Sequence, residues 1–454
     1  MKVFRERNQA LMTDLYQLTM AAGYFKYKRE TMGVFELFVR DLCPRRSYLV
    51  VAGIEQALDY LETLSFSKEE IHFLKNLPLF KNVDGEFFDF LENFKFSGDV
   101  WAAPEGSIIF SNEPILQVVA PITEAQIVET FLLSIINFET MIATKASRMF
   151  HAAKEKGVVD FGSRRAQGPE AAILAARASY VGGCVGTSNV YAGKEYNIPI
   201  YGTIAHSWVM SFESEIESFK KYNSIFPDNT VLLLDTYDTI EAAKKIKEFK
   251  GKIRGVRLDS GNIELESRKI RKILDSNGMK DVIIIASSDL NEYVIDKFSE
   301  KNTPIDMYGV GTELVTSPDA PSIGGVYKLV EIREKGKIRY TAKLSEGKST
   351  IPGQKQIFRK IENNYFSEDI LGLHSEGENF KKHTPILEKV MESGRIIKLE
   401  RDLKKIRENS IKNLKMVKEK YKDINTCEEF PVKLSKNLKK LLERVKNEIH
   451  TGGH

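Results

Sequence analysis

The sequence of 454 residues predicts an α/β protein built around a closed or nearly closed parallel α/β barrel. From about residue 157, apolar runs of four to six residues alternate with amphipathic helical segments, as in the βα units of a parallel sheet. So many units in series indicate a barrel rather than a small open sheet. The expected strands are 158–162, 183–188, 198–203, 230–235, 253–259, 282–288 and 306–312.

The barrel is expected to interrupt a second domain. Residues 1–120 mix strand-like runs such as GVFELFV with helical periodicity, and we expect an N-terminal α+β domain there. The barrel domain is placed at 121–325. Beyond it the alternation stops, and the last sixty residues are a charged helical tail. We expect 326–454 to return to the first domain or to pack beside it.

Composition excludes several classes of protein. Hydrophobic residues at 42%, charged residues at 29% and a net charge of +4 are ordinary for a soluble globular chain and do not require nucleic acid. The first twenty residues contain no apolar run of signal-peptide or membrane-spanning length. Cys43, Cys184 and Cys427 are far apart and odd in number, which argues against a disulfide framework or a zinc cluster. We therefore expect a cytoplasmic protein without membrane segments.

Polar residues gather where the expected strands end. In a parallel α/β barrel these carboxyl ends meet on one face, where ligands bind. Nearly every strand stops in a charged or small polar residue, and this clustering outweighs any single position. The candidates are Phe161 with Arg164 and Arg165, Ser188, His206, Asp235 with Asp238, Arg257 with Asp259, Ser287 to Asp289, and Gly309 to Thr312.

These residue types suit an anionic ligand. The glycines of YGVGT (308–312) let backbone N–H groups approach a phosphate, although the motif also occurs as an ordinary βα turn. Arg164 and Arg165 can bind pyrophosphate or carboxylate, or else form a surface salt bridge. Arg257 and Asp259 share a strand face and suit substrate or Mg²⁺, or a structural ion pair. Asp235 closes an apolar strand, a common place for a metal or ribose ligand.

Other nucleotide-binding motifs are missing. No G-x-G-x-x-G follows the first strand of a βαβ unit, which argues against a dehydrogenase, and there is no P-loop. The sequence therefore predicts recognition of a phosphorylated ligand, with magnesium as the expected metal. His206, in GTIAHSWV, has no obvious structural purpose, although a lone histidine is more often structural than catalytic.

Seven stretches between residues 11 and 359 resemble the nicotinate phosphoribosyltransferases, a type II phosphoribosyltransferase family. They are LMTDLYQLTMAAGY, DFGSRRAQG, VGTSNVYAG, GTIAHSWV, VRLDSGN, YGVGTELVTS and KLSEGKSTIPGQKQIFR. The resemblance implies an irregular or incomplete α/β barrel domain plus a split α+β sandwich domain. It also implies transfer of phosphoribose from 5-phosphoribosyl-1-pyrophosphate (PRPP) to nicotinate. The products are nicotinate mononucleotide for NAD biosynthesis (salvage) and pyrophosphate.

The resemblance also implies roles for individual residues. His206 matches the histidine that ATP phosphorylates transiently, which makes the reaction ligase-like. Phe161 matches an aromatic residue that stacks on the pyridine ring, and Tyr16 one that stacks on the other face from a second subunit of a homodimer. Arg257 matches the arginine that reaches the ring's 3-substituent. The expected phosphate ligands are Ser287, Ser288, Gly309, Gly311 and Thr312, with Arg164 and Arg165 at the pyrophosphate and Asp235 and Asp259 at Mg²⁺.

The resemblance also implies that Ser188 favours the acid substrate over the amide. Nicotinamide-using relatives carry an aspartate at the matching position, which would repel the carboxylate of nicotinate by about 4 kcal/mol at 4 Å and an effective dielectric near 20. Two alternatives remain: a nicotinamide phosphoribosyltransferase, and a non-enzymatic protein whose basic tail binds nucleic acid or a membrane surface. Quinolinate enzymes share the barrel but are shorter. Interspersed acidic residues in the tail favour a solvated helix face.

Overall fold

The computed structural model describes residues 9–154, 156–248 and 253–451. The chain divides into two compact units: Met1–Met141 with Ser322–His454, here called the sandwich unit, and Ile142–Pro321, the barrel unit. The sequence placed the boundaries at 120/121 and 325/326 instead. The first differs because α7 (Glu129–Ala152) carries the chain from one unit into the next without a break in its helical pattern.

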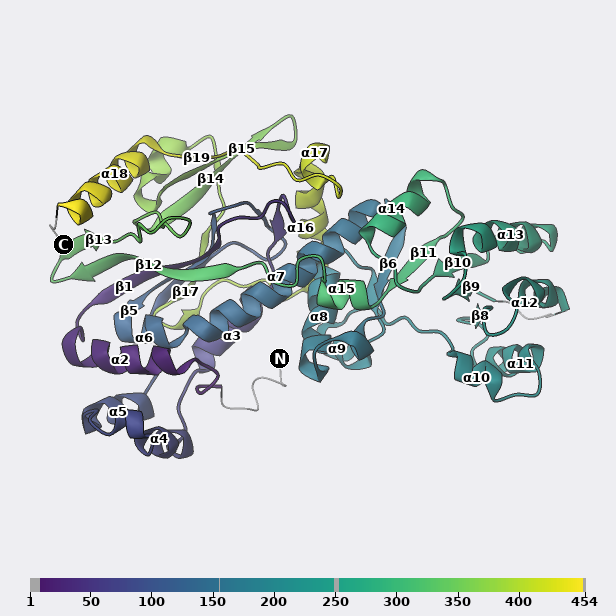
Figure 1. Ribbon diagram of the computed structural model, residues 1–454, viewed down its shortest axis with the longest axis horizontal. Coiled ribbons are helices and arrows are strands. Elements are labelled where there is room, and N and C mark those ends of the chain that lie inside the picture. Colours follow the sequence, from purple (N-terminus) through teal and green to yellow (C-terminus); the bar gives the residue numbers. More distant parts are fainter. Residues whose placement is uncertain (1–8, 155, 249–252, 452–454) are drawn as a thin grey trace. The chain divides into compact units, whose positions relative to one another are not determined.

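The barrel unit contains a six-stranded parallel sheet in the order β7-β6-β11-β10-β9-β8. Because β11 pairs with β6, the order runs cyclically along the chain, as in a barrel. Figure 1 shows β6, β11, β10, β9 and β8 following one another in this order. The strands are β6 (Gly157–Asp160), β7 (Gly186–Thr187), β8 (Val231–Leu233), β9 (Gly255–Leu258), β10 (Ile283–Ala286) and β11 (Met307–Val310).

The barrel is incomplete between β7 and β8. The strand expected at 198–203 is reduced to a single parallel bridge between Thr187 and Ile200, so His206 does not end a strand and instead begins α10. Pro199 lacks a backbone N–H, which limits ladder formation in this segment. Within the described residues, the fold is therefore an irregular α/β barrel open at one seam.

Helices of the barrel unit start where strand-end polar residues cap them. Asn189, Asp238, Asn262 and Asn291 each accept a hydrogen bond from the first turn of the following helix, which satisfies backbone N–H groups that lack helical partners. The helical segments are η2 (Ser163–Arg165), α8 (Pro169–Val181), α9 (Val190–Tyr196), α10 (His206–Met210), α11 (Glu215–Ile225), α12 (Thr239–Lys245), η3 (Ile246–Glu248), α13 (Ile263–Ser276), α14 (Glu292–Glu300) and α15 (Thr312–Thr316).

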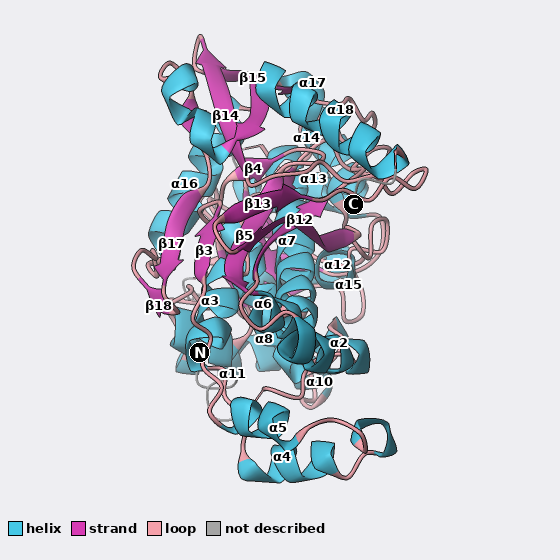
Figure 2. Ribbon diagram, turned by 90° about the vertical axis from the view of Figure 1, so that its left-hand side faces the viewer, coloured by secondary structure: helices cyan, strands magenta, loops and turns pink. Residues whose placement is uncertain are grey.

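The sandwich unit is split along the chain, since β1 from the N-terminal part pairs with β5 on one side and with β12 from the C-terminal part on the other. Figure 2 shows β14 and β15 as a layer apart from β17, β3, β5 and β12. The large sheet has the order β13 (Lys337–Tyr340), β12 (Gly325–Glu334), β1 (Met32–Val39), β5 (Pro114–Pro121), β3 (Asp99–Ala102), β17 (Glu388–Glu392), β18 (Arg395–Ile396). The smaller sheets are β16 (Thr384–Pro385), β14 (Lys355–Glu362), β15 (Tyr365–Leu373), β19 (Val432–Leu434), and β2 (Leu49–Val50) with β4 (Ile108–Ile109).

Buried charges join the two larger sheets. Lys355 of β14 lies 2.5 Å from Glu36 of β1, and both side chains are almost fully buried. Gln117 of β5 donates to the Glu36 carboxylate and to the Lys355 carbonyl. A buried ion pair of this kind is tolerated because its hydrogen bonds replace those that water would make.

Helices from both ends of the chain complete the sandwich unit, and the charged tail packs rather than extends. Leu438, Leu441 and Val445 of α18 are buried, so the amphipathic pattern of the tail is explained by core packing. The helices are α2 (Leu15–Tyr27), α3 (Ile54–Thr63), α4 (Lys68–Lys75), η1 (Pro78–Phe80), α5 (Gly85–Glu92), α6 (Ile122–Ile127), η4 (His374–Phe380), α16 (Leu403–Met416), α17 (Glu419–Lys422) and α18 (Lys436–His450).

The expectation that the cysteines form no disulfide is wrong. Cys43 and Cys427 are joined, although 384 positions separate them in the sequence. Spacing along the chain could not reveal this pair, because the two cysteines meet only when the C-terminal segment returns to the sandwich unit. Cys184 is buried in the barrel unit. Disulfides are uncommon in cytosolic proteins, so cysteine usage no longer supports a cytoplasmic location.

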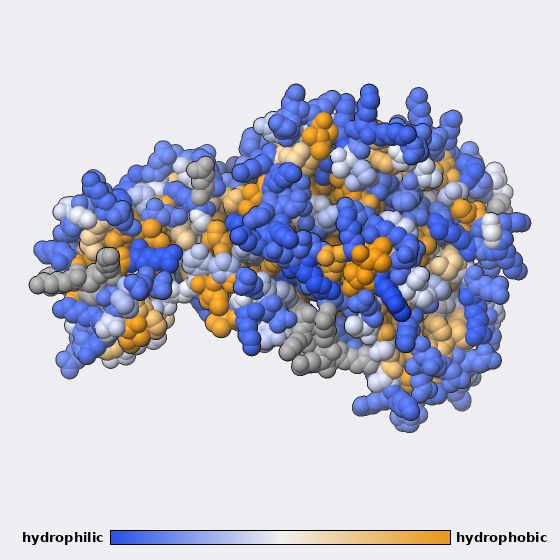
Figure 3. Space-filling view, turned by 180° about the vertical axis from the view of Figure 1, so that it is seen from behind, coloured by the Kyte–Doolittle hydropathy of each residue, from blue (hydrophilic) through white to orange (hydrophobic). Residues whose placement is uncertain are grey.

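Among the described residues, none forms a helix that is both long and apolar enough to cross a bilayer. Figure 3 shows hydrophilic residues over most of the face seen there, with hydrophobic residues in scattered clusters.

Candidate active site

A pocket of about 200 Å³ lies at the carboxyl ends of β6, β9, β10 and β11. Every residue that lines it belongs to the polar strand ends singled out in the sequence. The lining residues are Phe161, Arg164, Arg165, Arg257, Asp259, Ser287, Ser288, Asp289, Gly309, Gly311 and Thr312. Four strands far apart in the sequence therefore bring one set of side chains together, as barrel geometry requires.

Positive charge prevails in this pocket, with three arginines against two aspartates. Arg164 and Arg165 are exposed in the turn after β6 and can adapt to a ligand. Arg257 is held more firmly: it donates to the hydroxyl of Thr203 and lies 3.9 Å from Asp259. Burial lowers the pKa of Arg257, and the carboxylates of Asp259 and Asp235 oppose that shift. The guanidinium remains charged, since an arginine pKa lies far above neutral pH.

A chain of hydrogen bonds orders the acidic side of the pocket. Ser287 donates to the carboxylate of Asp259, whose own backbone N–H donates to Asp235 at 3.1 Å. Ser260 donates to the same Asp235 oxygen at 2.5 Å, whereas the other oxygen, Oδ1, is buried and has no hydrogen-bond partner among the described residues. Asp235 therefore offers one uncompensated carboxylate oxygen beside the pocket.

His206 lies next to this acidic chain rather than in the pocket wall. Its Nδ1 is 3.2 Å from the hydroxyl of Thr236, and its Nε2 is 3.9 Å from Oδ2 of Asp259. The imidazole is 40% exposed and therefore accessible from solvent. The histidine thus touches the pocket through Asp259, which lines it.

Glycine at position 309 makes room for the ring of Phe161. A Cβ atom at Gly309 would lie 2.5 Å from Cδ2 and 2.6 Å from Cε2 of that ring. The ring therefore fixes one wall of the pocket only because no side chain occupies position 309. At Ser288, φ is +123°, a strained conformation for a non-glycine residue that often marks a ligand-binding turn.

Replacing Gly309 with alanine is expected to displace Phe161. Overpacking of this kind is typically worth 1–3 kcal/mol, so we expect about a tenfold rise in the KM of whichever ligand stacks on the ring. Steady-state kinetics measure this directly. Gly85→Ala is the control, since a Cβ there meets no atom within 4 Å. An unchanged KM in Gly309→Ala would show that the ring makes no ligand contact.

Other predicted residues lie outside the pocket wall. Ser188 follows β7, and its backbone N–H donates to the carbonyl of Asp160 at 2.8 Å. Asp238 caps α12, which accounts for it structurally. Tyr16 belongs to the sandwich unit, where its hydroxyl donates to Glu129 at 3.2 Å and its side chain is 49% exposed.

Sequence reasoning missed Asp160 and Thr203. Asp160 is fully buried, and it accepts hydrogen bonds from the backbone of Gly162 and the hydroxyl of Thr187, both at 2.7 Å. It thereby holds the turn that carries Phe161. Burial raises the pKa of Asp160, and these two hydrogen bonds oppose the shift. The sequence did contain a signal for Asp160: a single acidic residue at the end of an apolar strand, the same feature that marked Asp235.

A second cavity of about 420 Å³ adjoins the first, and Phe161 lines both. It is lined by residues 199–203, at the open seam, and by residues at the amino ends of β8 to β11, among them Val231 and Arg254. Its remaining walls include the apolar side chains of Ile283, Ile285 and Met307. Phe161 thus lies between the charged pocket and a second cavity of mixed polarity.

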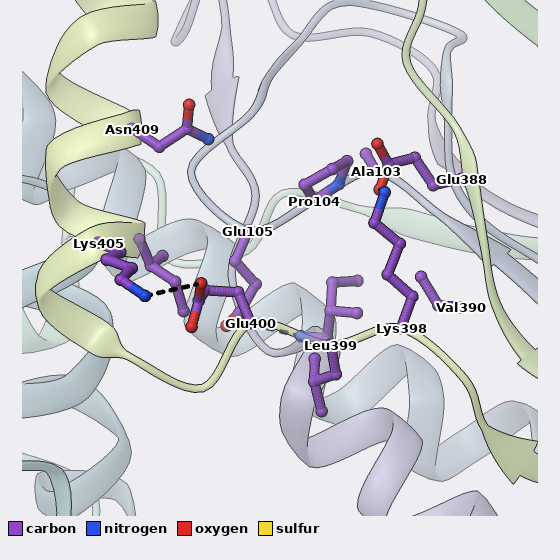
Figure 4. Close-up of a pocket in the computed structure, with 12 residues that line it drawn as sticks. Ala103, Pro104, Glu105, Glu388, Val390, Lys398, Leu399, Glu400, Lys405 and Asn409 are labelled. Atoms are coloured by element: carbon purple, nitrogen blue, oxygen red, sulfur yellow. Dashed lines mark hydrogen bonds and ion pairs between the residues drawn. The ribbon is translucent and has the colours of Figure 1, made fainter.

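The sandwich unit has its own cavity, of about 450 Å³ (Figure 4). Both lysines that line it pair with glutamates: Lys398 with Glu388 at 2.7 Å, and Lys405 with Glu400 at 3.8 Å. No arginine lines it. The charges that a phosphate would need are therefore already neutralised there, and we place the active site in the barrel unit.

The fold and the site define an α/β-barrel protein whose pocket suits a ligand with several anionic groups. Family models of nicotinate phosphoribosyltransferase match three parts of the chain: the N-terminal domain over 11–137, the family itself over 157–350 and the C-terminal domain over 373–442. The chain belongs to the nicotinate phosphoribosyltransferase family, as the motifs indicated.

Relatives agree over nearly the whole chain. A nicotinate phosphoribosyltransferase of Mycobacterium tuberculosis is 43% identical over 87% of this chain and 84% of its own. That of Bacillus subtilis is 39% identical over 96% and 94%. The crystal structure of human nicotinic acid phosphoribosyltransferase superposes with a TM-score of 0.83 at 26% identity, and covers 95% of this chain and 99% of the human one.

Proposed function

We propose that this protein is a nicotinate phosphoribosyltransferase of NAD biosynthesis, which forms nicotinate mononucleotide and pyrophosphate from nicotinate and PRPP. One observation carries the proposal. In a chain of this family, Arg164, Arg165 and Arg257 line the same pocket as two turns of small residues, 287–289 and 309–312. PRPP carries a phosphate and a pyrophosphate on one ribose, and the pocket offers separate groups suited to each. Because PRPP and ATP are intracellular metabolites, the location we propose is cytoplasmic.

Each part of PRPP has matching side chains. The 5′-phosphate is assigned to the turns of Ser287 and Ser288 and of Gly309, Gly311 and Thr312, which supply hydroxyl and backbone N–H donors. The pyrophosphate is assigned to Arg164 and Arg165, because guanidinium groups bind such oxygens in pairs. Nicotinate is assigned to Phe161, where the two cavities meet, with Arg257 at its carboxylate.

Catalysis in this assignment depends on positioning. The bond between ribose C1′ and pyrophosphate breaks through an oxocarbenium-like state that needs little proton transfer, so the protein must align the ring nitrogen with C1′ and stabilise the leaving group. Phe161 holds the plane of the ring. The arginines hold the pyrophosphate, and Asp259, fixed by Ser287, faces the same space.

Magnesium suits the acidic side of this pocket. The described residues contain no group of three or more His, Cys, Asp or Glu side chains that could hold a metal, but Mg²⁺ is commonly bound by one or two carboxylates and substrate phosphates. Asp235, with its unpartnered buried oxygen, and Asp259 are the proposed ligands. When bound, Mg²⁺ would neutralise charge on the pyrophosphate.

His206 is the proposed site of transient phosphorylation by ATP, which couples ATP hydrolysis to the reaction. Its contact with Thr236 holds the imidazole in place, and its exposure leaves room for a phosphoryl group. Phosphorylation would add negative charge beside Asp259 and so change the binding of PRPP and pyrophosphate.

A homodimer with shared sites is also proposed. Several apolar side chains are exposed around Tyr16: Leu15, Tyr16 and Met20 of α2, and Met12 just before this helix, each 38% to 50% exposed. An exposed apolar cluster of this kind suits a second copy of the chain. Tyr16 of each protomer would then stack on the pyridine opposite Phe161 of the partner.

The proposed function is tested by product formation from PRPP with nicotinate or nicotinamide, each with and without ATP. We expect nicotinate mononucleotide to form from nicotinate and to form faster with ATP. Preference for nicotinamide would support the amide-specific alternative instead. Absence of both products would refute the proposed activity.

Ser188→Asp is expected to shift the substrate preference. A carboxylate near the ring's 3-substituent repels nicotinate and accepts from the amide of nicotinamide, so the ratio of kcat/KM values should move toward nicotinamide by on the order of 100-fold. Ser188→Asn is the uncharged control and should move the ratio much less. An unchanged ratio in Ser188→Asp would remove Ser188 from the ring site.

A further inference from the structure

Lys145 lies outside the pocket, on the part of α7 that belongs to the barrel unit, and its side chain is completely buried. Its ammonium nitrogen is 2.5 Å from Glu292, 2.9 Å from Asp319 and 3.9 Å from Glu313. Arg148, one helical turn further along α7, donates to the other oxygen of Glu292 at 2.9 Å. One buried lysine therefore contacts three carboxylates.

The three acidic residues follow, in the sequence, the two turns assigned to the 5′-phosphate. Glu292 is the first residue of α14 and follows the turn of Ser287 to Asp289. Glu313 directly follows Thr312 in α15, and Asp319 comes just after that helix. The strands before the two turns, β10 and β11, are parallel neighbours. Lys145 thus connects the chain segments behind both turns.

The charge balance of the cluster depends on Lys145. Burial alone would raise the pKa of Glu292, but Lys145 and Arg148 hold it below its ordinary value. Burial raises the pKa of Glu313, Lys145 opposes this shift, and Glu292 and Asp319 add to it. Without the ammonium group, three carboxylates on two adjacent segments would repel one another. That repulsion would separate the turns and add negative potential next to the phosphate.

We propose that Lys145 is a positioning residue that sets the spacing of the Ser287–Asp289 and Gly309–Thr312 turns and thereby the affinity for the phosphorylated sugar. The proposal rests on the proposed function for the identity of that sugar. Stability alone does not explain the cluster, because well-packed apolar residues commonly stabilise a fold as much as a buried ion pair or more. A misplacement of about 1 Å in a binding group can cost about 100-fold in rate.

The test uses Lys145→Met in the full chain, since methionine keeps much of the side-chain length without the charge. We expect the KM for PRPP and the dissociation constant of ribose 5-phosphate, measured by calorimetry, each to rise about tenfold, with less than about a twofold change in the KM for nicotinate. Asp319→Asn is the second variant, for use if Lys145→Met fails to fold. It is milder because the side chain of Asp319 is 27% exposed. It should weaken ribose 5-phosphate binding about threefold.

Lys355→Met is the matched control. Lys355 is almost as deeply buried, lies 2.5 Å from Glu36 in the sandwich unit and lines no part of the pocket. It should lower the unfolding temperature and leave ribose 5-phosphate affinity within about twofold of wild type. If Lys145→Met and Asp319→Asn both bind ribose 5-phosphate with an affinity within twofold of wild type, the proposal is overturned. Calorimetry keeps the two inferences separate: wild-type protein that binds ribose 5-phosphate but makes no product contradicts only the proposed function.

Discussion

His206→Ala is expected to abolish transfer of radiolabel from γ-labelled ATP to the protein and to remove the stimulation of the reaction by ATP. The imidazole is the proposed phosphoryl acceptor, and alanine leaves no nucleophile at that position. Slow synthesis without ATP should persist, because the pocket groups that bind PRPP and nicotinate do not include His206. Acid-labile, base-stable protein phosphorylation and product formation are the two measurements.

His72→Ala is the control for this experiment. His72 lies on α4 of the sandwich unit, where its ring contacts Asn76 at 3.0 Å, and it has no proposed part in the reaction. That variant should label and respond to ATP as wild type does. Label retained in His206→Ala would exclude His206 as the acceptor, whatever happens to the rate.

Phe161→Ala and Tyr16→Ala, each inactive alone, are expected to regain activity when they are mixed and allowed to exchange subunits. If each site combines Phe161 of one chain with Tyr16 of the other, a mixed dimer has one intact and one doubly defective site. Random pairing then gives about a quarter of wild-type activity. Activity after mixing, measured against total protein, tests both the dimer and the two stacking roles.

The matching control mixes Phe161→Ala with Arg165→Ala. Both residues line the same pocket in one chain, so no mixed dimer contains an intact site and no recovery is expected. Recovery in this control would point to simple refolding of the mutants. Failure of the Phe161 and Tyr16 pair to recover, with subunit exchange demonstrated, would contradict a shared site.

Much of the barrel was predictable because parallel strands in this fold are short, apolar and bounded by polar residues. Each of β7, β8, β9, β10 and β11 lies within its expected segment, and β6 begins one residue before its own. The exception, 198–203, has the composition of a strand but forms one bridge at Ile200. Composition alone cannot show whether a neighbouring strand is present. Among the residues that the structure describes, no strand pairs with Ile200 on the open side of the seam.

The pocket was predictable for the same reason that the barrel was: strand ends converge wherever the strands are parallel. Contacts between distant segments were not predictable. Cys427 meets Cys43 only because the C-terminal segment returns to the sandwich unit. In the sequence, Lys145 is one polar residue within a long helical pattern. Only the folded chain places the carboxylates of Glu292, Glu313 and Asp319 around it. Tyr16 and Ser188 stay predictions, since neither lines the pocket within one chain.

Crystals of the protein with ribose 5-phosphate and pyrophosphate would test the central claim, that the ends of consecutive barrel strands form one binding site for PRPP. We predict the sugar phosphate between Ser288 and Thr312 and the pyrophosphate against Arg164 and Arg165. Density for both anions in the cavity of the sandwich unit, with the barrel pocket empty, would contradict it.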